Sequence, residues 1–319
     1  MSASRAAEGV VGESGRIDPR EGSSLYYSLL WTDDAVRERL LARLSLIHAL
    51  LTTLEEVQEP GVAERKVHWW HEELERLGRG APRHPRTLAC VDSLGGVPEA
   101  ESACLELLSF AAATRYSPPA TELDLIAGLE RGGRAALSLL AHALSGEPAD
   151  LGADADVRHP ALALGLGLHA TLARLPRLLH RGHAVFSDER YARHRLSPAD
   201  LAGHVRRRKD TPRESDETRP LAPTLGGVPV VVDASASRRV LIAEVVDEAS
   251  DTLQAALADA DYRRVYRRAE LAPVARLAAL RARQLALWKD TRPDLLRERT
   301  ALTPLVKLYV AWRHRRGAR

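Results

Sequence analysis

The chain has 319 residues, which is enough for one large domain or two ordinary ones without a disulfide or structural metal. Apolar residues make up 45% and charged residues 28%, a composition that excludes disordered and fibrous proteins. The net charge of +3 is too small to indicate a nucleic-acid partner. No run of about 18 uncharged apolar residues predicts a membrane span, and residues 1–21 lack the apolar core of a secretory signal.

Residue usage favours helices over sheets. The sequence contains 5 Trp, 7 Tyr and 2 Phe, so most of its apolar residues are Leu, Ala and Val. Its two cysteines, Cys90 and Cys104, cannot form a disulfide scaffold or a four-cysteine zinc site, and we expect buried thiols in a reducing compartment. The predicted class is all-α.

In chain order, residues 1–20 are small and polar, and we expect a disordered tail. Beyond them, apolar residues recur every three or four positions, as on the buried stripe of a helix. This periodicity predicts helices over residues 40–54, 62–77, 88–113, 122–144, 168–179, 238–258, 270–289 and 302–315, with another beginning at Ser197. The aperiodic segment at about 206–230 is expected to be a mobile loop within one domain of residues 21–319.

Five local motifs follow one another in the order of a known family. They are SSLYYSLL at 23–30, EPGVAERKVHWWHEEL at 59–74, His84-Pro85, Arg181-Gly182 with LSPADL at 196–201, and LTPLVKLYVAWR at 302–313. Together they resemble the squalene/phytoene synthase family, whose members join two prenyl diphosphates head to head. The resemblance implies an isoprenoid-synthase-like helical bundle around a central cavity.

Such enzymes neutralise the departing diphosphate with Mg²⁺, held by two aspartate-rich helical segments that face each other. Here the first segment falls on residues 51–55, where Leu51 and Thr52 replace the leading aspartates and Glu55 the third, after His48 in place of a basic residue. The second falls on residues 167–178, where Arg174 and Leu178 replace the aspartates and Pro176 interrupts the helix. We therefore expect no cofactor, although the family uses Mg²⁺.

The residues that replace the aspartates indicate a different site. Three arginines, Arg174, Arg177 and Arg181, could bind a phosphate directly, because guanidinium groups match phosphate oxygens. The more conservative alternative is that they lie on a solvated face or pair with Glu55 and Glu56, closing an unused cavity. The candidate ligand-binding residues are Ser23, Ser24, Tyr27, His48, Glu55, Arg174, Arg177 and Arg181. We expect no catalytic residue.

Two functions are favoured, and a third, an intact prenyl synthase, would require both aspartate-rich motifs to lie elsewhere in the sequence. The first is a pseudoenzyme that keeps the cavity fold for a binding, scaffolding or assembly role. The second is a transferase or lyase of isoprenoid biosynthesis that holds a prenyl diphosphate through arginines without metal. The expected partners are another protein or an isoprenoid or lipid ligand, and no nucleic acid.

The C-terminal helix carries an apolar stripe of Leu305, Leu308, Tyr309 and Trp312 beside a basic end that includes Arg313. We expect this stripe to pack on the core of the domain. The alternative is contact with an anionic membrane surface. The expected location is accordingly the cytoplasm, with peripheral association at the inner membrane surface as the second possibility.

Overall fold

A computed structural model describes residues 9–11, 17–55, 57, 59–142, 159–206, 234–268, 271–298 and 300–316. Its helices are α1 (Ser24–Leu29), α2 (Asp34–Thr52), α3 (Pro60–Gly78), α4 (Pro85–Leu88), α5 (Val91–Leu94), α6 (Pro98–Tyr116), α7 (Glu122–His142), α8 (Pro160–His180), α9 (Asp188–Arg193), α10 (Pro198–Arg206), α11 (Ala234–Ala258), α12 (Ala260–Tyr266), α13 (Ala272–Thr291) and α14 (Pro304–Arg313). The predicted all-α class is confirmed.

Within the N-terminal segment expected to be a disordered tail, the described residues form a short strand pair, and residues 1–8 and 12–16 lie outside the described ranges. Strand β1 (Gly9–Val11) pairs antiparallel with β2 (Ile17–Pro19), with Gly9 opposite Pro19. The expected loop at 206–230 lies outside the described residues, apart from Arg206 at the end of α10.

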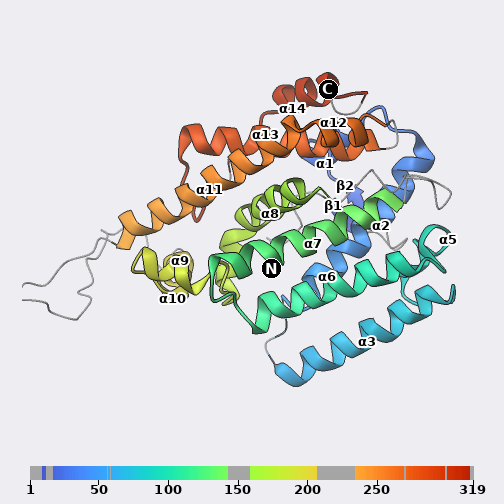
Figure 1. Cartoon of the computed structure of the whole chain (residues 1–319), viewed down its shortest axis with the longest axis horizontal. Helices are drawn as coiled ribbons and strands as arrows, with labels where there is room; N and C mark the ends of the chain where they lie inside the picture. Colours follow the sequence, from blue (N-terminus) through green and yellow to red (C-terminus); the bar gives the residue numbers. More distant parts are fainter. Residues whose placement is uncertain are drawn as a thin grey trace, which may run out of the picture.

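The long helices stack side by side, with α8 in the middle (Figure 1). Helices α7 and α11 pack on α8, α6 packs on α7, and α13 packs on α11. The outer positions belong to α3, which packs on α6, and to α14, which packs on α13. None of the helices in the described ranges is both long and apolar enough to cross a membrane.

Two glycines allow α8 to lie close to both neighbours. A Cβ on Gly133 of α7 would lie 2.6 Å from the carbonyl oxygen of Ala163, and a Cβ on Gly165 would lie 2.9 Å from the Cβ of Leu253 on α11. Both distances are too short for a side chain, so these backbones touch only because glycine is present. Pro176 does not end α8, which continues to His180, but it leaves the carbonyl of Leu172 without its helical N–H donor.

The motif region at α3 and α4 is held by a buried carboxylate. Glu73 is fully buried in α3 and accepts hydrogen bonds from the N–H groups of Arg83 and His84, each at 2.8 Å, and from the Thr87 hydroxyl. Arg76 adds a charged hydrogen bond at 2.9 Å. Burial alone would raise the pKa of Glu73, but these bonds hold it at about 2. Glu73 therefore fixes the loop that carries the His84-Pro85 motif.

We predict that Glu73→Gln lowers the free energy of unfolding by about 2 kcal/mol at pH 7, because an amide replaces a carboxylate that accepts several hydrogen bonds. The unfolded carboxyl titrates near 4.3 and the folded one near 2, so the unfolded chain binds more protons between these values. The difference between wild type and variant should be full above pH 5 and shrink as the pH falls towards 2. Urea unfolding monitored by circular dichroism measures it.

The control is Glu75→Gln, because Glu75 lies two residues further along the same helix and is exposed. A Glu73→Gln loss no larger than that of the control would show that the carboxylate does not hold the loop.

Candidate functional site

Three arginines at the C-terminal end of α8 converge on one buried carboxylate, and the last of them, Arg181, directly follows the helix. Glu55 lies in the turn after α2, and its side chain is 5% exposed. Arg174 contacts one of its oxygens directly, while Arg177 Nε and Arg181 Nη1 lie 3.6 and 3.5 Å from the other, Oε2. We call Arg174, Arg177 and Arg181 the arginine cluster. The two segments that the family resemblance places opposite each other therefore do meet, but through guanidinium groups.

Local structure explains this convergence from both sides. The three arginines are spaced by three and four residues, so they share a face of α8. On the other side, the Trp70 indole of α3 donates to the Thr53 hydroxyl at 2.8 Å, which fixes the turn that carries Glu55. The residue range of α2 ends at Thr52, and Glu56 lies outside the described residues.

Positive charge predominates among these four side chains, since one carboxylate faces three guanidinium groups. Burial, followed by the charges of Arg177 and Arg181, lowers the pKa of Arg174 to about 10. The Nε atom of Arg174 is buried and makes no hydrogen bond within the described structure, and the same holds for the Nε atom of Arg115 on α6. Such donors are costly to bury without an acceptor, so this region favours an anion.

Two histidines border the arginine cluster. Burial, and then Arg174, Arg86 and Arg177, lower the pKa of His48 on α2 to about 4. His183, just after α8, has its pKa lowered to about 4 by burial and then by Arg115, Arg174 and Arg181. Both imidazoles are therefore neutral at pH 7. The two ring nitrogens of His183 are buried without a hydrogen-bond partner among the described residues.

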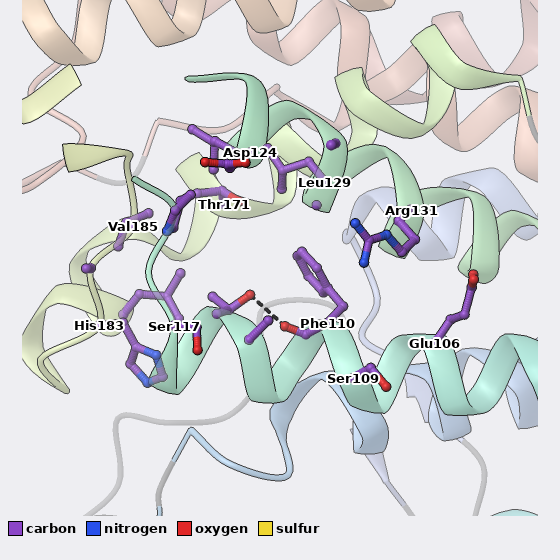
Figure 2. A pocket seen from close by; sticks show the side chains of 18 residues that line it. Glu106, Ser109, Phe110, Ser117, Asp124, Leu129, Arg131, Thr171, His183 and Val185 are labelled. Atoms are coloured by element: carbon purple, nitrogen blue, oxygen red, sulfur yellow. Dashed lines mark hydrogen bonds between the residues drawn. The ribbon is translucent and has the colours of Figure 1, made fainter. Parts of the chain in front are cut away.

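A cavity of about 500 Å³ lies between α6, α7, α8 and residues 183–185 (Figure 2). In Figure 2, Phe110 rises from α6 towards Leu129 of α7, with His183 at one end of the cavity and Arg131 at the other. Its apolar wall consists of Phe110, Ala113, Leu125, Leu129, Leu178 and Val185. The volume falls within the range of small-molecule sites.

The cavity and the arginine cluster share a helix face. Thr171 and Leu178 line the cavity, and they alternate with Arg174 and Arg181 at spacings of three and four residues along α8. His183 belongs to both, because it lines the cavity and feels the charge of Arg174 and Arg181. The arginine cluster does not line the cavity itself, whose charged lining residues are Glu106, Asp124 and Arg131. A cavity with an apolar wall next to a cationic cluster suits a ligand that has an apolar body and an anionic head.

The residues at this site do not fit magnesium. Mg²⁺ takes several oxygen ligands, usually carboxylates and water. The one carboxylate at the matching positions, Glu55, is engaged by the arginine cluster, and the positions opposite carry Arg174 and Leu178. In addition, no group of three His, Cys, Asp or Glu side chains within the described residues could hold a metal ion.

The structure divides the residues predicted for the site. It brings together His48, Glu55 and the arginine cluster, whereas Ser23, Ser24 and Tyr27 belong to the α1 region, which packs on α13 and α14. Ser23 caps α1 by accepting a hydrogen bond from the Tyr26 N–H at 3.1 Å. The prediction included a central cavity but missed Arg115 and His183, because α6 and residues 183–185 reach the site only by tertiary packing.

No protein-family model matches this sequence, and no curated protein matches it. Among solved structures, the crystal structure of a dehydrosqualene synthase in complex with ligand matches it with a TM-score of 0.61 at 13% sequence identity. The match covers 91% of each chain, so it extends over nearly the whole bundle. Together with the helical architecture, this likeness shows that the chain has the isoprenoid-synthase fold.

Proposed function

We propose that this chain is a non-catalytic binding protein that holds an amphiphilic anion, with a prenyl diphosphate as the model ligand. In this proposal the arginine cluster binds the anionic head, and the cavity between α6, α7 and α8 takes the apolar part. One observation carries the proposal: Arg174, Arg177 and Arg181 converge where the resembling enzymes place aspartates.

Charge supports the head-group assignment. A diphosphate would give Arg174 and Arg115 acceptors for their buried Nε atoms, and guanidinium groups bind phosphate oxygens in pairs. It would also relieve the mutual repulsion that lowers the pKa of Arg174. Glu55 holds the cluster together in the free protein, and a stronger anion would compete with it.

The arginine cluster and the two histidines beside it argue against the Mg²⁺-dependent prenyl transfer of the resembling family. That reaction needs a divalent cation on the departing diphosphate. The site has guanidinium groups where the carboxylate ligands of such a cation would be. A protonated imidazole could supply a proton to the leaving group, but His48 and His183 are neutral at pH 7.

A second candidate is a transferase or lyase that acts on a prenyl diphosphate without metal. The observation that favours it is again the arginine cluster, because three guanidinium groups could offset the charge of a departing diphosphate. Turnover distinguishes the two candidates, since both predict binding.

We predict that farnesyl diphosphate raises the melting temperature of the protein equally with 5 mM Mg²⁺ and with EDTA, because arginine replaces metal. Arg174→Ala should weaken the affinity by about 10-fold to 100-fold, the usual effect of losing a charged hydrogen bond. Differential scanning fluorimetry over a ligand series gives the shift, and titration calorimetry gives the dissociation constant.

Arg193→Ala serves as the control, because Arg193 is an exposed arginine of α9. A second pair tests the cavity: Ala113→Phe fills an exposed lining position, and Ala173→Phe places the same group on the exposed side of α8. Ala113→Phe should weaken binding of farnesyl diphosphate but not of inorganic pyrophosphate. The proposal would be contradicted if the stabilisation by farnesyl diphosphate disappeared in EDTA. It would also be contradicted if Arg174→Ala kept that stabilisation in full, as the control Arg193→Ala is expected to do.

We further predict that the protein releases no pyrophosphate from farnesyl or geranylgeranyl diphosphate, with or without Mg²⁺. A coupled phosphate assay after pyrophosphatase treatment measures the release. Release stimulated by Mg²⁺ would overturn the non-catalytic assignment, and metal-independent release that Arg174→Ala abolishes would establish the second candidate in its place.

A further inference from the structure

Helix α14 turns its apolar stripe outward, contrary to the expectation that it packs on the core. Leu305 is 78% exposed and Tyr309 58%, and Leu308 and Trp312 are exposed as well. Lys307 and Ala311 are the buried residues of the helix, and Val306 and Val310 are half-buried. This orientation is the reverse of an ordinary amphipathic surface helix, in which the apolar stripe is buried.

Buried cations fix this orientation. The Lys307 ammonium group donates to the carbonyl of Gly22 at 2.8 Å. Arg276 of α13 is buried and donates to the carbonyls of Ser28 at 2.6 Å and of Arg315 at 3.0 Å. Rotating α14 to bury its apolar stripe would break the Lys307 bond and expose Ala311, so the outward face is part of the fold.

Positive charge accompanies the exposed stripe. Residues 304–316 contain no Asp or Glu, and Arg313, Arg315 and Arg316 follow the last aromatic residue. The Arg315 guanidinium lies 4.9 Å from the centre of the Trp312 ring. Exposed Arg267 and Arg268 precede α13, so they lie at the same end of α13 as Arg315.

From this arrangement we infer that α14 docks on an anionic lipid bilayer. The α14 face, defined as Leu305, Leu308, Tyr309 and Trp312 with Arg313, Arg315 and Arg316, inserts its apolar side chains at the headgroup boundary. Its arginines lie against lipid phosphates. Tyr and Trp suit this boundary because their rings are apolar and their edges are polar.

The dimensions of the α14 face favour a bilayer over a protein partner. A ten-residue helix is about 15 Å long and 10 Å wide, so its exposed face covers on the order of 150 Å². A stable protein interface buries roughly 800 Å² on each side. Shallow insertion into a bilayer needs no such area, and this face lies at the outer edge of the molecule (Figure 1).

The test is co-sedimentation of the full chain with vesicles of phosphatidylglycerol and phosphatidylcholine in equal parts, and with phosphatidylcholine alone, in 0.1 M salt. We expect binding to the anionic vesicles that weakens as salt is raised. Leu308→Glu with Trp312→Glu should abolish it. Arg313→Gln with Arg316→Gln should weaken it by about 25-fold, since each basic residue near an anionic surface contributes about fivefold.

Matched controls lie elsewhere on the surface. Leu123→Glu alters a leucine that is 77% exposed on α7, and Arg79→Gln with Arg83→Gln removes two exposed charges beside α3 at the opposite edge. Circular dichroism should show unchanged melting for every variant. The inference fails if the wild-type chain leaves anionic vesicles unbound, or if the controls lose as much binding as the α14 variants. It also fails if the chain forms a dimer in the absence of vesicles and if Leu308→Glu with Trp312→Glu dissociates that dimer.

Discussion

The ion cluster between Glu55 and the three arginines at the C-terminal end of α8 is the interaction on which the site depends. Glu55 is the buried member of the cluster, and its carboxylate would be costly to bury in the turn after α2 without the three partly exposed guanidinium groups. The cluster therefore joins α2 to the central helix of the bundle. It also leaves an excess of positive charge next to His183, which lines the cavity, and this makes the contact a candidate binding site.

The rest of the bundle serves to hold both halves of that cluster in place. Gly133 and Gly165 let α8 lie tightly between α7 and α11, and this close packing sets the position of the helix that carries the arginines. On the other side, Trp70 holds Thr53, and Glu73 holds the loop of the His84-Pro85 motif. The motif segment at residues 59–74 therefore has a structural role here: Trp70 positions the turn that carries Glu55, and Glu73 positions the loop with His84.

Periodicity predicted the long helices well because, with the exception of α14, their apolar stripes are buried as expected, but it did not predict the short helices α1, α9 and α12. The expected pairing of Glu55 with arginine was one of two alternatives, and sequence could not choose between them because the choice depends on tertiary packing. Arg115 and His183 were missed for the same reason. The stripe of α14 was predicted correctly as a pattern but placed on the wrong side, because Lys307 binds the Gly22 carbonyl, a contact between residues 285 positions apart.

Titration calorimetry of Glu55→Gln with farnesyl diphosphate in EDTA tests the central claim most directly. If Glu55 is the internal counter-ion of an anion site, the loss of its charge should destabilise the free protein. The variant should then bind the diphosphate several-fold more tightly than wild type does. If Glu55 instead serves as a metal ligand, the variant should bind more weakly than wild type in Mg²⁺ and show no gain in EDTA. That second result would contradict the account.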